Sequence, residues 1–471
     1  ANCASDTARP SARTAPTGTN RYGGCSSRQG VAGIQQTTVN VLHFPRSREL
    51  SFSVVNLDEQ ESLVNLELVN DQGSLVTSTT AAVPSHMQYA RYVDALLGPE
   101  ANAAGRWVRG FSTRSDTYGL WLVNDPALTY LDGTRLVDVR QGALDFIFTV
   151  LDVGEGHDTT FSLINSTKNQ ASVGLRRYDA NGQQLGHQRI VINGYGRAEV
   201  SASALFPGLQ SSDSIRVESD RALVAMAWFG TESAMAVLEG IREDAGTFTL
   251  YCPHMAVGAI GGVEYRSMLA LVNVGGAAAA AQLALHTDGG EQIEAPQPIH
   301  LPAQGKVWVD LAELFSLTEP TSGYLRIQGA AGDRLVGCIT FEEAATGRFH
   351  SCLPLQGKGA AKFLLGHIAN GTLNSIPFFT GLSVLNAGMT TRTVTVSAYD
   401  QYGVLQDSKS LTIFGGRRQV FLLDQLMPGL TAIFGGYILV EGPPESDLMV
   451  FELFGDQSLN FLSAVPAVPV D

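Results

Sequence analysis

The sequence predicts an all-β protein built of four tandem antiparallel β-sandwiches behind an extended N-terminal tail. A pattern of apolar and turn residues recurs four times along the 471 residues. Within each copy, apolar and polar residues alternate between turns, as in TVTVSAYD (393–400), which is typical of half-buried strands. The alanine-rich run GGAAAAAQLAL (275–285) favours a helix by propensity, but its counterparts in the other copies are strand-like, so we expect a strand there.

The predicted tail comprises residues 1–36. It begins with Ala rather than Met, from which we expect that a preceding segment is removed. Its composition, rich in Ser, Thr and Ala, cannot build a core. Because the chain as a whole carries a net charge of −14, we expect the basic tail to contact the acidic surface of a neighbouring subunit. The predicted contact residues are Arg9, Arg13, Arg21 and Arg28.

Each repeat is marked first by an apolar strand that ends in asparagine. The strands are FSVVN, FSLIN, LALVN and LSVLN, and their asparagines are Asn56, Asn165, Asn273 and Asn386. A glycine follows each asparagine after 17 residues and closes a polar turn. The four glycines are Gly73, Gly182, Gly290 and Gly403.

The second of these turns, DANG (179–182), has two interpretations. Asp179, Asn181 and Gly182 follow the order of a calcium loop, but position 12 of such a loop requires Glu and is Ile190 here. Asp and Asn bond to their own backbone and Gly accepts a positive φ, which favours a hairpin turn. The sister turns lose acidic residues, so we interpret all four turns as structural.

A leucine-rich stretch about 40 residues after each asparagine completes the repeat, as in SALFPGL (203–209). The boundaries follow as residues 37–142, 143–245, 246–358 and 359–471. The junctions contain no Pro- or Ser-rich linker. We therefore expect restricted motion between domains and a bent or compact rod.

The repeats resemble the tandem immunoglobulin-like β-sandwiches of bacterial secreted and surface proteins. The L-x-L-V-N strand, the Y-D-x-x-G hairpin, the L-F-P-G-L crossing and the closing strand with Phe-Gly carry the resemblance across residues 37–471. The resemblance implies a secreted modular protein and implies no particular activity.

Five cysteines are present. Cys3 and Cys25 flank the tail segment and are expected to form a disulfide. Cys338 and Cys352 flank a predicted hairpin and are expected to form a second one, which leaves Cys252 free and buried. An alternative is a zinc site, because Cys252 and Cys352 each lie two residues from a histidine, and residues i and i+2 of a strand share a face. The histidines concerned are His254 and His350.

The sequence offers no catalytic motif, and we predict neither an enzyme nor a cofactor. His254 and His367 occupy matching places and are interpreted as hydrogen-bonding residues of a first strand. Acidic residues such as Glu342 and Glu343 are expected in turns. Nothing in the sequence indicates that two carboxylates face one cleft, as a glycosidase requires.

The composition limits the classes of function. The net charge of −14 argues against nucleic-acid binding, and no apolar run reaches the about 18–20 residues of a membrane helix. The charged fraction of 16% lies below the usual ~25%, which suits packing between copies. We predict a secreted, non-catalytic structural subunit of a filament, sheath or surface layer that self-associates. The alternative is an adhesin or a carbohydrate-binding array that contacts surface glycans.

Overall fold

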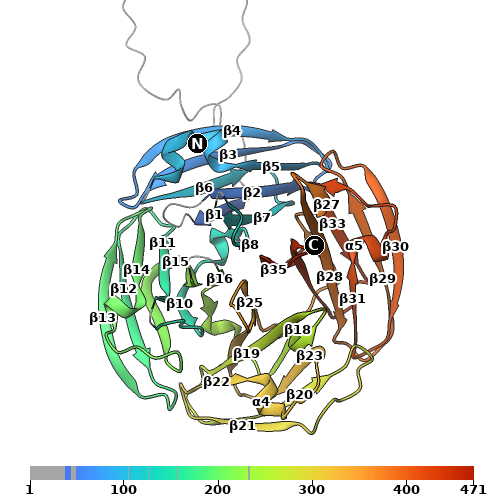
Figure 1. Cartoon of the computed structure of the whole chain (residues 1–471). Coiled ribbons are helices and arrows are strands. Elements are labelled where there is room, and N and C mark those ends of the chain that lie inside the picture. Colours follow the sequence, from blue (N-terminus) through green and yellow to red (C-terminus); the bar gives the residue numbers. More distant parts are fainter. Residues whose placement is uncertain are drawn as a thin grey trace, which may run out of the picture. The chain divides into compact units, whose positions relative to one another are not determined.

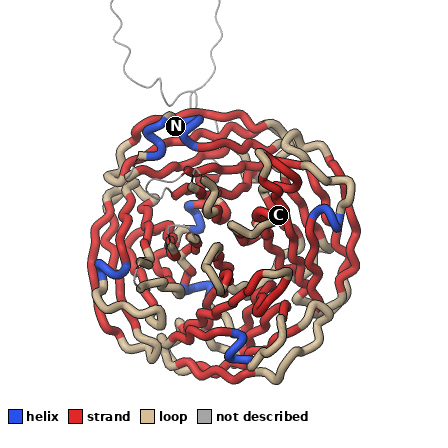
Figure 2. Tube along the Cα trace, viewed as in Figure 1, coloured by secondary structure: helices blue, strands red, loops and turns tan. Residues whose placement is uncertain are grey.

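In the computed structural model, residues 36–471 form one compact unit, which contains the described architecture. The structure describes residues 38–43 and 49–470, apart from Ala104, Pro126, Glu155, Glu232 and Ser233. The predicted tail, with its arginines and with Cys3 and Cys25, lies outside these residues. All strand pairings are antiparallel and strands dominate the described chain, so the all-β prediction is confirmed (Figure 2).

The described chain is divided below into four segments. Segment one contains β1 (Thr38–His43), β2 (Glu49–Asn56), β3 (Ser62–Asn70), β4 (Leu75–Val83), β5 (Gln88–Tyr92), α2 (Val93–Leu97), η1 (Pro99–Asn102), β6 (Arg106–Ser112), β7 (Thr117–Asn124), β8 (Leu131–Arg135), β9 (Val137–Asp138) and η2 (Val139–Gln141). Segment two contains β10 (Ala143–Phe148), β11 (Thr160–Asn165), β12 (Ala171–Tyr178), β13 (Gln184–Ile192), β14 (Arg197–Ser201), α3 (Ala202–Leu205), β15 (Ser214–Gly230), β16 (Met235–Glu239), β17 (Ile241–Arg242) and η3 (Glu243–Ala245).

The second half of the chain repeats most of this element order, and segment four adds the strands β27 and β32. Segment three contains β18 (Thr249–Ile260), β19 (Val263–Asn273), β20 (Ala279–His286), β21 (Gln297–Leu301), β22 (Lys306–Asp310), α4 (Leu311–Phe315), β23 (Thr321–Gln328), β24 (Leu335–Glu343) and β25 (His350–Pro354). Segment four contains β26 (Lys362–Leu365), β27 (Ala369–Leu373), β28 (Ile376–Asn386), β29 (Arg392–Tyr399), β30 (Leu405–Ile413), β31 (Arg417–Leu422), α5 (Leu423–Leu426), β32 (Ile433–Phe434), β33 (Tyr437–Glu441), β34 (Leu448–Asp456), β35 (Leu462–Pro466) and β36 (Val468–Pro469). The alanine-rich run 275–285 is strand β20, as the repeat predicts.

Each segment has two layers with the same strand order. In segment one the layers are β4-β3-β6-β1-β9 and β5-β2-β7-β8, and in segment four they are β30-β29-β33-β26-β36 and β31-β28-β34-β35. In segment two the long strand β15 belongs to both layers, because Ser214–Ser219 pair with β12 and Leu223–Trp228 pair with β11. In segment three β18 and β19 join the layers.

The core of each segment lies between its two layers. Strand β3 shows why: its alternating residues Val64, Leu66 and Leu68 are buried in the same cluster as Phe52 and Trp107 from both layers. The helices are single short turns that cross between the layers. In the part of the chain that the structure describes, no helix has the length and apolar character needed to span a bilayer.

The segments also bury apolar surface against one another. Phe229 of segment two clusters with Ala270 of segment three, and Tyr324 of segment three clusters with Leu385 of segment four. Residue Leu364 of segment four clusters with Val55 of segment one. Segment four therefore packs on segment one, and the expected rod is wrong: the four segments close on themselves (Figure 1).

Strands β8, β16, β25 and β35 lie in the middle of the four segments (Figure 1). Asp132 of β8 links three segments, because it accepts hydrogen bonds from Val237 N at 2.8 Å and from Ser463 Oγ at 2.7 Å. Burial raises the pKa of Asp132 to about 7, despite these two donors. Ser351 joins segment three to segment four by accepting from Ala464 N at 2.9 Å.

Candidate functional site

The repeated asparagines hold the turns of each segment in place. All four are buried, and each donates its side-chain N–H groups to the carbonyl four residues later and to the carbonyl of the last residue of a later strand, which is β4, β13, β21 or β30. The acceptors are Gln60 and Val83 for Asn56, Asn169 and Ile192 for Asn165, Ala277 and Leu301 for Asn273, and Thr390 and Ile413 for Asn386. Because a buried amide needs such partners, the asparagine fixes the turn that follows this strand. We call these four turns the receiving turns (residues 84–87, 193–196, 302–305 and 414–417).

The turn at 179–182 uses its aspartate on its own backbone. One carboxylate oxygen of Asp179 accepts from Asn181 N at 2.9 Å and from Gln183 N at 2.8 Å. In the described ranges, no three His, Cys, Asp or Glu side chains gather as a set that could hold a metal ion. The carboxylate is thus engaged as a hairpin turn requires.

This turn and its three sisters also bind the next segment, a role that the sequence did not reveal. We call them the docking turns (residues 70–73, 179–182, 287–290 and 400–403). In each, the second residue's carbonyl accepts a backbone hydrogen bond of 3.0 Å from the neighbouring segment. The bonds are Arg197 N to Asp71 O, Lys306 N to Ala180 O, Arg418 N to Asp288 O and Gln88 N to Gln401 O. The last bond joins segment four to segment one.

The glycine that ends each docking turn lies against the receiving turn. Gly182 has a φ of +79°, and a Cβ built on it would lie 2.0 Å from the carbonyl oxygen of Ala303. Backbone conformation and contact with the next segment therefore both require glycine. Its counterparts Gly73, Gly290 and Gly403 have φ values of +89°, +83° and +76°, and a Cβ on them would lie 2.0, 2.5 and 2.2 Å from a carbonyl oxygen of a receiving turn.

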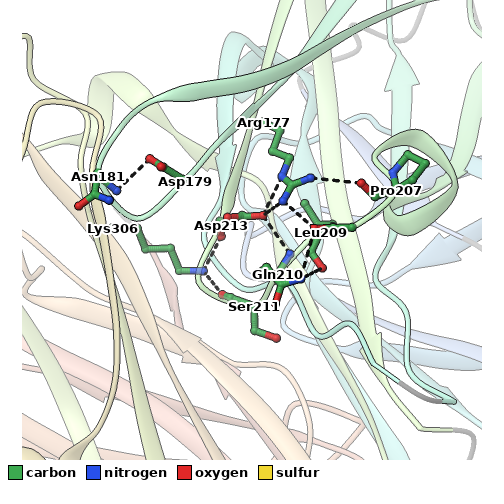
Figure 3. A network of polar contacts seen from close by, with 10 residues as sticks. Arg177, Asp179, Asn181, Pro207, Leu209, Gln210, Ser211, Asp213 and Lys306 are labelled. Atoms are coloured by element: carbon green, nitrogen blue, oxygen red, sulfur yellow. Dashed lines mark hydrogen bonds and ion pairs between the residues drawn. The ribbon is translucent and has the colours of Figure 1, made fainter.

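A buried polar side chain lies under every docking turn. Between segments two and three it is Lys306, whose ammonium group donates to the carbonyls of Ser211 and Asp213, both at 2.6 Å (Figure 3). Burial lowers the pKa of Lys306 to about 7. Arg177 of segment two donates to the Asp213 carboxylate at 2.7 Å and so fixes the loop that receives the lysine.

The other three junctions place a different side chain at the equivalent position. Arg197 donates to Asp71 at 2.8 Å, and Arg418 donates to Asp288 at 2.8 Å. In the closing junction the residue is neutral Gln88, which donates to the carbonyls of Gly366 and Gly436 and accepts from Gly436 N. Two of these three junctions thus contain an arginine–carboxylate pair, and the closing one is a neutral hydrogen-bond network.

The disulfide expected between two cysteines of segment three is not confirmed. Cys252, Cys338 and Cys352 are free and buried in the structure. The expectation that two of them face each other across the hairpin is wrong in register: Cys338 lies opposite Pro354, and Thr340 lies opposite Cys352. The two cysteines are diagonal rather than directly opposite neighbours, and their thiols share a side-chain hydrogen bond. Burial raises the pKa of Cys252 to about 12, which makes its thiol unreactive.

The residues of the alternative zinc site do not come together as a set of metal ligands. His254 packs on Phe451 of segment four with ring centroids 5.5 Å apart, while His350 packs on Phe229 of segment two at 5.1 Å. Burial lowers the pKa of His254 to about 3 and that of His367 to about 4, so both rings are neutral. The Nδ1 atom of His254 accepts from Arg418 at 3.0 Å, which fits the predicted hydrogen-bonding role.

A cavity of about 300 Å³ is lined by residues of all four segments next to the central strands. Its charged lining includes Arg135, which pairs with Glu239 at 3.1 Å, and the exposed Lys358. Val237, Phe363 and several prolines supply apolar walls. Segments one and two are tied together here by the Arg135–Glu239 pair, so the cavity belongs to the junctions of the fold.

A second cavity, of about 260 Å³, lies between segments two and three. Asp152, His157, Glu342 and His350 line it, and the Nδ1 atom of His157 lies 3.3 Å from an Asp152 oxygen. An imidazole beside a carboxylate can exchange protons with a bound molecule. Sequence reasoning missed this group because two of its members lie in segment two and the other two lie in segment three.

The third cavity has the most apolar lining of the three and lies between segments three and four, with a volume of about 370 Å³. Tyr265, Phe341 and Phe379 form its aromatic wall, and Asp424 and Gln457 supply polar groups at the same opening. Concave sites with aromatic walls and few polar groups are typical of small-ligand binding.

No family model and no curated protein matches the sequence. One solved structure that the comparison returns is a glycoside hydrolase family 32 protein from Bifidobacterium adolescentis. It is 8% identical, and the comparison covers 88% of this chain and 99% of that chain at a TM-score of 0.16. A likeness at that score carries no argument about fold or function.

Proposed function

We propose that this protein is a secreted, non-catalytic structural subunit of an extracellular assembly, and that each subunit works as one closed, rigid body. The supporting observation is the hydrogen bond from Gln88 N to Gln401 O, which joins segment four to segment one. A closed set of segments has no unmatched docking turn at either end, and its interfaces resist relative motion.

The four segments correspond, in this proposal, to four immunoglobulin-like sandwiches with the boundaries 37–142, 143–245, 246–358 and 359–471. The two layers of each segment and their recurring strand order support the assignment. The assignment carries no activity by itself, because sandwiches of this kind serve many functions.

Contacts between subunits then use surfaces other than the docking turns. The basic tail is one candidate, with Arg9, Arg13, Arg21 and Arg28 contacting the acidic body of the next subunit, and Cys3–Cys25 remains its predicted disulfide. A head-to-tail contact of this kind does not close and therefore builds a fibre.

Electron microscopy of the full chain at increasing concentration tests the proposal. We expect ordered polymers from the intact protein, and single bodies with an unchanged melting temperature after deletion of residues 1–30. Intact protein that stays as isolated particles at every concentration would contradict the structural function.

A binding function is the second candidate, and the aromatic cavity between segments three and four favours it. Sugar rings stack on aromatic side chains, and Asp424 and Gln457 would accept and donate hydrogen bonds to hydroxyl groups. A glycan array decides: binding that is lost in Phe379→Ala and kept in Phe414→Ala, an exposed aromatic outside this cavity, would support a surface-glycan receptor.

A further inference from the structure

Each segment ends its first layer in an edge strand. The edges are β4, β13, β21 and β30, which pair on one side with β3, β12, β20 and β29. On their other side, none has a strand partner among the described residues. An unpaired edge offers its backbone N–H and C=O groups to any other extended chain.

Three of the four edges carry a residue that discourages pairing. Aligned on their last buried residues (Val83, Ile192, Leu301 and Ile413), the edge strands can be compared position by position. Lys409 of β30 takes the place of Thr79 of β4, and Arg189 of β13 and Pro298 of β21 take the place of Thr80. Charged side chains and proline at these positions are the usual means by which proteins protect an edge.

Strand β4 has no such protection. Its nine residues, LVTSTTAAV, include no charged residue, no proline and no glycine. Leu75 and Val76 at its start are 57% and 38% exposed, and Ser78 and Thr80 are exposed in its middle. Helix α2 packs with Val83 at the buried end of the strand, so the stretch from Leu75 to Thr80 stays accessible.

The sequence of β4 is complementary to itself. In an antiparallel pair of two copies centred on Thr79, Ser78 lies opposite Thr80 of the second copy. Exposed apolar residues also meet, because Val76 lies opposite Ala82. Hydroxyl pairs and apolar pairs both stabilise cross-strand contacts. The same pairing of β30 would place Lys409 against its own copy, and like charges directly opposite destabilise a pair.

We propose that the outer edge of β4 pairs antiparallel with β4 of a second copy of this chain and forms a two-fold contact. Because the pairing is isologous, each β4 is satisfied by one partner and the contact closes as a dimer. This inference rests on the proposed structural function and names one surface of its self-association. A tail clasp would then link dimers into larger assemblies.

The test uses sedimentation of the full chain and two matched double variants. Ser78→Lys with Thr80→Lys places four lysines across the two-fold contact. The control, Ser408→Lys with Ser410→Lys, makes the same change at the equivalent exposed positions of β30. We expect the β4 variant to raise the dimer dissociation constant by more than about tenfold and the control to leave it unchanged. Thr80→Pro, which copies Pro298 of β21, serves as a second variant if the lysines lower the melting temperature.

The outcomes separate this inference from the proposed function. A β4 variant that associates as tightly as the unchanged protein overturns the β4 contact and leaves the structural function standing. Discrete dimers that depend on β4 but never grow into larger assemblies support the contact and contradict the structural function. An unchanged protein that is monomeric at every concentration overturns both.

Discussion

Gly182 shows how much one residue of the repeat does. It gives the hairpin its positive φ, and it lets the turn touch the backbone of segment three at Ala303. Asp179, three residues earlier, only bonds to its own turn. The sequence revealed the first role of the glycine through its recurrence, but the contact depends on a partner 121 residues away that no local pattern indicates.

We therefore expect Gly182→Val to lower the melting temperature far more than Asp179→Ala does. The valine combines a positive φ with a collision against backbone, whereas the alanine removes local hydrogen bonds and costs under about 1 kcal/mol. Thermal melts of both variants check this, with and without calcium. Equal losses, or a melting temperature that rises with calcium, would contradict the account of this turn.

Glu452 is a buried acid that sequence reasoning missed. It is 1% exposed, and neither carboxylate oxygen has a hydrogen-bond partner within the described chain. Burial raises its pKa well above the usual range. Because the folded protein holds this proton more tightly than the unfolded chain does, its contribution to stability is complete below the unfolded pKa and is lost as the pH rises through the folded pKa.

Glu452→Met should therefore stabilise the protein more at pH 8 than at pH 4. A similar apolar volume removes the cost of a buried acid, which is worth about 1–4 kcal/mol in comparable replacements. Denaturant titrations at the two pH values measure the difference, and Glu264→Met, at an exposed position, is the control. A gain that is the same at both pH values would speak against a buried, protonated glutamate.

At the scale of the elements, the sequence predicted the apolar strands. It did not predict that a neighbouring segment covers their second face. The run Leu382–Asn386 of β28 is buried at every residue, whereas a strand with one exposed face would alternate. A continuous apolar run indicates a strand covered on both faces. The sequence thus contained a sign that segments stack, although it gave no indication of which segment covers which.

The paired side chains under the docking turns give a prediction at the same scale. Asp288→Ala should lower the free energy of unfolding by about 1–3 kcal/mol, because it leaves the buried guanidinium of Arg418 without its carboxylate. The natural counterpart in the second docking turn is already alanine, Ala180, above an ammonium group satisfied by carbonyls. Denaturant unfolding should show a smaller loss for Asp179→Ala. A loss no larger for Asp288→Ala would mean that the ion pair contributes nothing.

For the whole molecule, local patterns were sufficient for strands and turns but not for closure. Short junctions at 142, 245 and 358 suggested a rod because each joins only consecutive segments. Closure depends on a contact between segment one and segment four, in which His86 lies against Gly403, 317 residues further along the chain. The buried polar side chain at this junction, Gln88, is neutral, so no charge pattern in the sequence indicated the contact either. The diagonal placement of Cys338 and Cys352 was not foreseen for a similar reason, because strand pairing and not sequence spacing sets the register.

The central claim is that segment four docks on segment one within a single chain. The most direct measurement replaces Tyr402, an exposed residue of the docking turn 400–403 (the closing turn), by a photoreactive phenylalanine analogue and maps the cross-linked peptides by mass spectrometry. A mixture of ¹⁴N- and ¹⁵N-labelled protein distinguishes links within one chain from links between chains. We expect links between the closing turn and residues 84–91 of the same chain at every concentration. Links to segment one that appear only between chains, or no link to segment one, would contradict the closed body.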